Sequence, residues 1–276
     1  MKTPIGIHSL SMLLLTGLGL ALFSCGQQAA SNQGGALAGD VASQVYVAPG
    51  EYDEFYGFFS GGFSGQVSVY GIPSGRLLKV IPVFSVDGEK GYGFNEETKP
   101  MLQTSHGFVP WDDAHHPELS QTNGETDGRW VFINGNNTPR IARIDLTTFE
   151  TVEIIEIPNS GGNHSSPFTT ENTEYVVAGT RFGVPYPQKD VAIDSYAENF
   201  KGMLTFIKVG PEGQMEIAFQ VLLPAFDYDL AHSGKGASNG WTFFTSYNTE
   251  EKNTLLEVNA SQNDKDFIAA VNWKKA

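Results

Sequence analysis

The sequence has little cysteine and little positive charge. It contains one cysteine among 276 residues, so no disulfide can form within the chain. Its 17 Lys and Arg residues stand against 31 Asp and Glu residues, which gives a formal net charge of −14. No basic patch is available to neutralise phosphates, and we therefore expect no nucleic-acid partner.

Apolar residues with helical spacing are also scarce after residue 40, which argues against a helical fold. Glycine is abundant at 31 residues, and aromatic residues make up 12% of the chain. Many turns combined with aromatic and β-branched residues are typical of all-β domains. The length allows one large domain or two ordinary ones.

The first 24 residues have the pattern of a signal peptide. Lys2 supplies the positive charge, and residues 10–23 form an apolar run of fourteen residues that is too short to span a membrane. We therefore expect residues 1–24 to be a targeting segment that is not part of the fold.

The end of this segment, Leu22-Phe23-Ser24-Cys25, resembles a bacterial lipobox, in which the cysteine becomes the lipidated first residue. Lipidation of Cys25 would place the chain in the periplasm and connect it to a membrane through a lipid anchor alone. The alternative is cleavage by the ordinary peptidase, with Cys25 lost or free. Residues 25–45 are rich in Gln, Ala, Ser, Asn and Gly, which predicts a flexible tether.

Short strand-like segments recur along residues 46–276, which we expect to form one β domain. From Trp130 to Glu174 the step is 44 residues, close to the length of a propeller blade, and a loop insertion is expected around residues 182–200. About three blades are recognisable, whereas propellers close with four to eight, so we expect the N-terminal part of a longer protein. The predicted strands are 66–70, 77–84, 130–134, 140–146, 151–157, 174–179, 203–209, 214–223, 241–246, 255–258 and 266–273.

The segment Asp112-Asp113-Ala114-His115-His116-Pro117-Glu118 contains two adjacent histidines between acidic residues. Neighbouring side chains of a strand point to opposite faces, so two adjacent imidazoles reach one metal only from a loop or a strand end. Pro117 favours such a position. Asp113 is placed to accept the proton of the second ring nitrogen of one of them. The alternative is an exposed polar loop without a metal.

Several blocks of sequence, in the same order, resemble the N-terminal propeller domain of nitrous-oxide reductase. They include Asp53-Glu54-Phe55-Tyr56-Gly57-Phe58-Phe59-Ser60-Gly61-Gly62, Asp113-Ala114-His115-His116-Pro117, Asp127-Gly128-Arg129-Trp130-Val131-Phe132-Ile133-Asn134 and Tyr247-Asn248-Thr249-Glu250. The resemblance implies an all-β fold, the N-terminal blades of a seven-bladed β-propeller. It also implies a sulfide-bridged cluster of four coppers, with His115, His116 and His164 as the catalytic copper ligands in this chain.

The resemblance implies a reaction as well, the reduction of nitrous oxide to dinitrogen and water in denitrification. The sequence around His164 is similar to the family variant exported by the general secretory route, in agreement with a signal that lacks a twin arginine.

A binuclear copper centre on a C-terminal cupredoxin domain would lie beyond Ala276. The family forms a head-to-tail homodimer and takes electrons from a c-type cytochrome or a cupredoxin. We therefore expect the present chain alone to be inactive.

The resemblance further implies a structural calcium held by Tyr247, Glu250 and Asp266, since carbonyl and carboxylate oxygens suit calcium. The spacing between Glu250 and Asp266 is two residues longer than in the common form. The resemblance therefore does not determine which residue near Ala260 would supply the intervening carbonyl ligand. The alternative is a solvated acidic loop.

The remaining polar residues have ordinary interpretations. His106 and His232 match no ligand position, and we expect them at the surface or as hydrogen-bonded core histidines. Asp227 and Asp229 either line the central channel of the expected propeller or end a strand. The competing functions are a non-catalytic, lipid-anchored β-propeller binding module, which the fold alone cannot distinguish, and a metal-dependent hydrolase, against which the all-histidine pattern argues.

Overall fold

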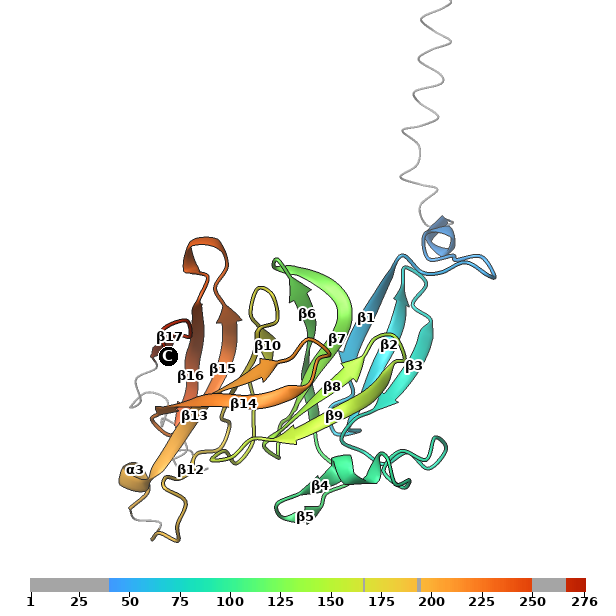
Figure 1. Cartoon of the computed structure of the whole chain (residues 1–276). Helices are drawn as coiled ribbons and strands as arrows, with labels where there is room; N and C mark the ends of the chain where they lie inside the picture. Colours follow the sequence, from blue (N-terminus) through green and yellow to red (C-terminus); the bar gives the residue numbers. More distant parts are fainter. Residues whose placement is uncertain (1–39, 166, 193–194, 250–266) are drawn as a thin grey trace, which may run out of the picture. The chain divides into compact units, whose positions relative to one another are not determined.

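The computed structural model describes residues 40–165, 167–192, 195–249 and 267–276. Within this part of the chain the fold is all-β, as predicted, and it is built from antiparallel sheets (Figure 1). Residues 1–24, Cys25, most of the expected tether, Glu250 and Asp266 lie outside the described residues. None of the described helices is long and apolar enough to cross a membrane.

The strands follow one another along the chain with few helical segments between them. Their bounds are β1 Phe55–Ser60, β2 Gln66–Ile72, β3 Leu77–Pro82, β4 Gln103–Thr104, β5 Gly107–Phe108, β6 Ala114–Thr122, β7 Glu125–Gly135, β8 Arg140–Asp145, β9 Glu150–Glu156, β10 Phe168–Thr169, β11 Tyr175–Gly179, β12 Val184–Pro185, β13 Phe200–Val209, β14 Met215–Leu223, β15 Phe226–Ser233, β16 Trp241–Thr249 and β17 Ile268–Asn272. The helical segments include η1 Lys99–Leu102, α3 Tyr196–Asn199 and η3 Gly236–Ser238.

The chain divides into two compact units, and residues 40–55 with 71–76 make up the described part of the smaller one. Asp53 organises this unit. Its carboxylate accepts hydrogen bonds from the backbone of Ser74 at 2.9 Å and from Arg76 Nη2 at 2.7 Å. Burial raises the pKa of Asp53, but these hydrogen bonds and the Arg76 charge outweigh it and leave the pKa below its ordinary value. A side chain at Gly71 would collide with this carboxylate, which explains the glycine there.

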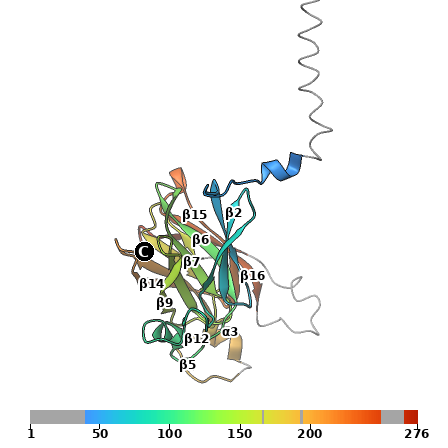
Figure 2. The ribbon, with the colours of Figure 1, turned by 90° about the vertical axis from the view of Figure 1, so that its right-hand side faces the viewer.

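The larger unit, residues 56–70 and 77–276, carries the sheets that follow one another along the chain. The order β6-β7-β8-β9 forms one sheet, and β10-β11-β13 with β14 forms the next. Figure 1 shows these two sheets side by side, and Figure 2 gives the same ribbon turned by 90°, a view in which they overlap. The sheet β15-β16-β17 comes after them, and the three-stranded sheet β1-β2-β3 comes first in sequence.

Apolar side chains pack between successive sheets and form a core at each junction. Val67 and Ile81 pack with Val131 and Ile144 between the first sheet and β6–β9. The next junction contains Trp130, Phe132, Ile141, Val176, Ala178 and Ile207. The third contains Phe168, Leu204, Phe206, Tyr228 and Phe244. Strands such as β8 are buried along almost their whole length because they have an apolar junction on each face.

The Ser60–Gly65 segment is a tight loop in which backbone approaches backbone. The backbone oxygen of Gly62 accepts a hydrogen bond from Ala114 N at 3.0 Å, and the two residues form a β-bridge. Gly62 has a φ of +56°, in the left-handed region that glycine adopts easily. The loop therefore holds the first residue of β6, immediately before the histidine pair.

Most predicted strands are present with nearly the predicted bounds, and the strand expected at 266–273 is β17. The insertion at 182–200 consists largely of loop, with β12 and α3 as its short elements. Among the described residues the structure adds seven strands that were not predicted, β1, β4, β5, β6, β10, β12 and β15. Four sheets of three or more strands are present where about three blades were expected. The strand predicted at 255–258 lies outside the described residues.

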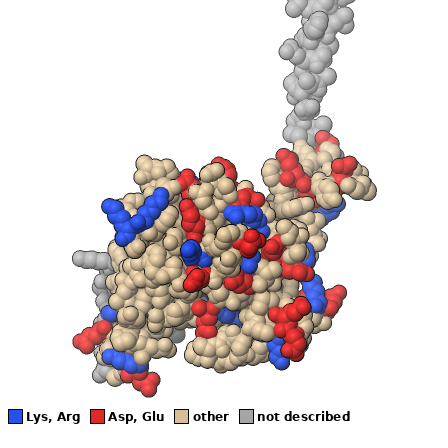
Figure 3. Space-filling model, in the orientation of Figure 1, with Lys and Arg blue, Asp and Glu red and all other residues tan. Residues whose placement is uncertain are grey.

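Charged side chains are distributed over the surface in both signs. Figure 3 shows acidic and basic residues interspersed on the face in view. Several are paired locally, among them Arg129 with Asp127 at 2.6 Å and Arg143 with Glu153 at 3.2 Å. The Arg129 guanidinium also lies 4.3 Å from the centre of the Trp130 ring.

Candidate metal centre

The histidine pair lies at the start of β6, where a β-bulge interrupts the pairing with β7. His115 is opposite Asn134 and Glu118 is opposite Phe132, so the register shifts between them. His116 has a φ of +37°, and Pro117, which has no N–H to donate, falls in the bulge. The bulge cancels the usual alternation, so the two adjacent rings lie together with centroids 4.1 Å apart. The pair therefore lies at the start of a strand, one of the two positions, a loop or a strand end, that the sequence predicts.

The third histidine comes from the loop between β9 and β10. Asn163 forms a β-bridge with Thr180, and its backbone oxygen accepts a hydrogen bond from Asn134 Nδ2. These contacts hold the loop beside the end of β7, opposite the histidine pair. The ring centroid of His164 lies 5.4 Å from that of His115 and 5.9 Å from that of His116.

The three imidazoles together form a site that fits a metal ion. Each offers one nitrogen, and these atoms all lie within 4.8 Å of one another. Among the described residues, His116 Nε2 is buried without a hydrogen-bond partner. An unpaired buried nitrogen is costly unless it has a ligand to bind, and a neutral imidazole nitrogen is a metal ligand. The structure thus brings together the three histidines that the sequence singles out.

The electrostatics of the three rings differ. Burial lowers the pKa of His115, although the Asp113 charge opposes this effect, and burial together with the neighbouring His115 lowers the pKa of His116. The hydrogen bond from His164 to Asp227 raises the pKa of His164 against the opposing effect of burial. His115 and His116 are therefore readily neutral and able to donate a lone pair to a metal.

Carboxylates stand behind two of the rings. His164 Nδ1 lies 3.0 Å from Asp227 Oδ2 and 3.1 Å from Oδ1, so this ring presents its Nε2 to the cluster. Asp113 Oδ1 lies 3.7 Å from His115 Nδ1, near the ring but beyond hydrogen-bond distance, so the hydrogen bond expected from the sequence stays a prediction. Asp229 also contributes a negative charge near the three rings.

The sequence left two roles open for Asp227, lining the channel or ending a strand. Asp227 and Asp229 are two residues apart, so both lie on one face of β15. This spacing is the one sequence signal that Asp227 faces a metal-binding histidine. Such carboxylates fix the tautomer and orientation of a metal-binding histidine.

A buried ion pair supports the segment that leads to the histidine pair. Asp112 and Arg140 are almost fully buried, and Arg140 Nη2 lies 3.5 Å from Asp112 Oδ2. Arg140 also donates hydrogen bonds to the backbone oxygens of Val109 at 3.1 Å and Trp111 at 3.3 Å. The pair therefore determines how the chain approaches β6.

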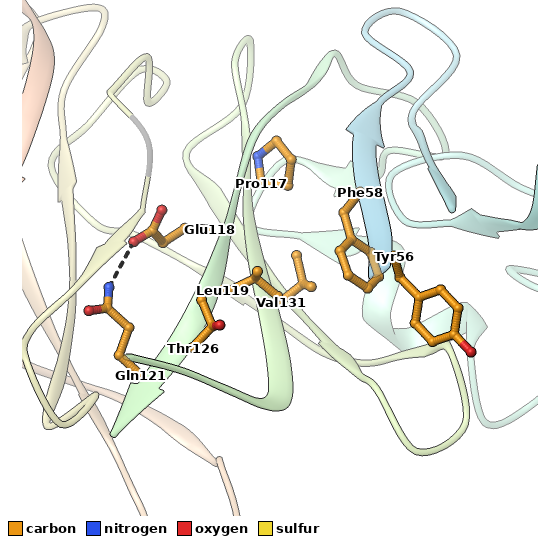
Figure 4. A pocket seen from close by; sticks show the side chains of 8 residues that line it. All are labelled: Tyr56, Phe58, Pro117, Glu118, Leu119, Gln121, Thr126 and Val131. Carbon is orange, nitrogen blue, oxygen red and sulfur yellow. Dashed lines mark hydrogen bonds between the residues drawn. The ribbon is translucent and has the colours of Figure 1, made fainter. Parts of the chain in front are cut away.

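A cavity of about 230 Å³ lies along β6 beyond the histidine pair. Phe58 and Tyr56 line it from β1, and Leu119 and Val131 line it from β6 and β7 (Figure 4). Glu118 accepts a hydrogen bond from Gln121 Nε2 at 3.3 Å, and burial raises the pKa of its carboxyl group.

Two further histidines lie outside this cluster, as expected, and the predicted calcium and lipid sites lie partly or wholly outside the described residues. His106 and His232 are exposed, and neither belongs to the three-histidine group. The backbone of Tyr247 is part of β16, but Glu250 and Asp266 lie outside the described residues, so the calcium site stays a prediction. The same holds for Cys25.

Comparison of the sequence with curated proteins identifies relatives along most of the chain. Over 238 residues it is 35% identical to nitrous-oxide reductase from Pseudomonas fluorescens, which covers 86% of the chain and 36% of that protein. It is 33% identical over 256 residues to nitrous-oxide reductase from Stutzerimonas stutzeri, covering 92% of the chain and 39% of the relative. The chain is homologous to nitrous-oxide reductase. This homology confirms the resemblance noted from the sequence. The chain spans less than two fifths of the length of these two relatives.

No family model matches the sequence. Among solved structures, hydrazine synthase from Kuenenia stuttgartiensis is similar with a TM-score of 0.49 and 13% identity, covering 79% of this chain and 47% of that chain.

Proposed function

We propose that this chain is the part of a copper-dependent nitrous-oxide reductase that supplies three histidine ligands of its catalytic cluster. The observation that carries the proposal is the convergence of His115, His116 and His164 in a chain homologous to that enzyme. The successive antiparallel sheets support an assignment to the first blades of a seven-bladed propeller.

The donor set favours copper over other metals that proteins hold. Imidazole nitrogens suit copper, whereas magnesium and calcium prefer oxygen ligands. His164 would bind through Nε2 because its Nδ1 is engaged by Asp227. His116 would bind through Nε2, the buried atom without a hydrogen-bond partner in the described structure.

The reaction we propose takes nitrous oxide, two protons and two electrons to dinitrogen and water. A copper–sulfide cluster, when bound, supplies the electrons and polarises a poor ligand. The residues of this chain hold the imidazoles at the start of β6 and in the loop after β9. The carboxylates of Asp113 and Asp227 orient two of them.

The relatives are longer than this chain, and the rest of such an enzyme would supply further ligands and the binuclear copper centre. The proposal includes a head-to-tail homodimer, a c-type cytochrome or cupredoxin as electron donor, and a periplasmic location with a lipid on Cys25. A calcium ion at Tyr247, Glu250 and Asp266 belongs to the same proposal.

The test is an anaerobic titration of the chain with Cu(I) in competition with a chromophoric chelator. Replacement of His115, His116 or His164 by Ala should each weaken Cu(I) binding by at least ~10-fold, since even the outer partners of ligands contribute 10–100-fold. The matched controls are His106→Ala and His232→Ala, exposed histidines outside the cluster, which should leave the affinity unchanged. Equal losses in all five variants, or no Cu(I) binding by the wild type, would favour a non-catalytic binding module.

A further inference from the structure

Asn136 lies directly behind the carboxylate that faces the histidine pair. Its Nδ2 donates a hydrogen bond to Asp113 Oδ2 at 2.8 Å, while Asp113 Oδ1 lies 3.7 Å from His115 Nδ1. Asn136 and Asp113 are both buried, with exposed fractions of 5%. The three side chains therefore form a line that runs from the end of β7 to the imidazole.

The backbone holds Asn136 in this place. It follows Gly135, the last residue of β7, which is opposite Ala114 in β6. The backbone N–H of Asn136 donates to the backbone oxygen of Asp113 at 3.0 Å. Two hydrogen bonds thus join Asn136 and Asp113, one between backbones and one between side chains.

The orientation of the Asn136 amide follows from the charge of its neighbour. With its nitrogen toward Asp113 the amide donates to a carboxylate, whereas the flipped amide would place oxygen against oxygen. Asn136 Oδ1, on the other side, is buried without a partner in the described structure. Asn136 therefore gives up an acceptor interaction in order to donate to Asp113.

We propose that Asn136 is a positioning residue: by holding Asp113 Oδ2, it aims Oδ1 at His115 Nδ1 and keeps the proton of His115 on Nδ1. Nε2 of His115 then keeps its lone pair for the metal. A free imidazole side chain prefers the opposite tautomer, with the proton on Nε2, so a protein that needs Nε2 as a ligand must impose the other form. At 3.7 Å, beyond hydrogen-bond distance, the Asp113 charge acts electrostatically on the Nδ1–H group of His115.

The proposal rests on the proposed function for its purpose, but its test does not require copper. The metal-free chain, labelled with ¹⁵N-histidine, is studied by long-range ¹H–¹⁵N correlation at a pH where the rings are neutral. His115→Gln assigns the His115 signals by their loss. The wild type should show His115 with its proton on Nδ1, and a wild-type proton on Nε2 overturns the proposal.

The variant Asn136→Leu has a similar volume and no donor. It should lower the ratio of the Nδ1-H to the Nε2-H form of His115 by roughly threefold to tenfold, the effect of losing one ordinary hydrogen bond. Asn136→Gln, which keeps an amide donor, should restore part of the ratio. His164 is the internal standard, because Asp227 holds its tautomer independently.

The matched control is Asn137→Leu, the same change one residue further on. Asn137 is exposed, and its side-chain oxygen accepts from Arg181 Nη1 at 3.3 Å. If Asn136→Leu and Asn137→Leu change the His115 ratio equally, or Asn136→Leu leaves it unchanged, the proposal is wrong. If Asn136→Leu does not fold, Asp113→Asn provides the second test and must shift the ratio in the same direction. A correct tautomer in a chain that binds no copper would refute the proposed function alone.

Discussion

His164 Nδ1 and Asp227 Oδ2 lie 3.0 Å apart although 63 residues separate them in the sequence. The bond connects the loop after β9 with β15, the first strand of a later sheet. Both side chains are largely buried, with exposed fractions of 19% and 13%. The contact thus links the candidate metal centre to the packing of the last described sheet.

The His164–Asp227 pair should make the stability of the metal-free chain depend on pH. Asp227 raises the pKa of His164 above its ordinary 6.5. A group whose pKa is higher in the folded than in the unfolded state stabilises the fold fully at pH values below its unfolded-state pKa. This stabilisation is lost as the pH rises through the folded-state pKa. Asp227→Asn should therefore reduce the free energy of unfolding by roughly 1–3 kcal/mol near pH 5.5, and by less near pH 9.

Urea denaturation at both pH values measures the two differences. His115 and His116 have lowered pKa values and act in the opposite direction, but they are present in both proteins and cancel in the comparison. The double variant with His164→Gln serves as the control, since Asp227→Asn should then have little pH dependence. A loss of stability that is the same at both pH values contradicts the assignment.

The strands of the core could be predicted because their apolar pattern is local. β7, β8 and β9 correspond to predicted segments, and Pro117 indicated a loop or a strand end for the histidine pair. β1 was missed because its aromatic residues run into a glycine-rich segment that resembles a loop. Asn136 and Asp227 could not be assigned, because their partners, Asp113 and His164, come together through tertiary packing.

The buried pair of Arg140 and Asp112 should be far more important for stability than a surface pair. Their exposed fractions are 1% and 0%. Removing Arg140 therefore leaves the buried Asp112 carboxylate without its counter-charge, and the backbone oxygens of Val109 and Trp111 without the Arg140 donor. Arg140→Met should cost about 3–5 kcal/mol. Arg129→Met is the control, because Arg129 is 42% exposed and its pair with Asp127 should contribute about 0–1 kcal/mol. Similar costs in chemical denaturation would show that the Arg140 pair is not electrostatically buried.

Cys25 should carry a lipid in the cell of origin, because Leu22-Phe23-Ser24-Cys25 resembles a lipobox. Metabolic labelling with a fatty-acid analogue should mark the wild type and leave Cys25→Ser unlabelled. Ser24→Ala retains the cysteine and is the matched control, which should still be labelled. Equal labelling of wild type and Cys25→Ser would rule out lipidation at this residue.

Copper binding should also depend on pH, and His164 should determine where the change occurs. A metal can bind His164 Nε2 only after the ring has lost a proton, and Asp227 raises the pKa of that loss. His115 and His116, with their lowered pKa values, are already neutral at the pH where His164 still holds its proton. The apparent Cu(I) affinity should therefore rise with pH, with one proton released from His164 on binding, and level off once the pH exceeds the raised pKa of His164. In Asp227→Asn the rise should move to lower pH, while the affinity at high pH falls by roughly tenfold because the ring loses its orienting partner.

Competition with a chromophoric chelator across this pH range measures both effects, and the exposed His232→Ala variant should follow the wild type. An Asp227→Asn profile that coincides with the wild type would show that Asp227 neither raises the pKa of His164 nor orients it for the metal.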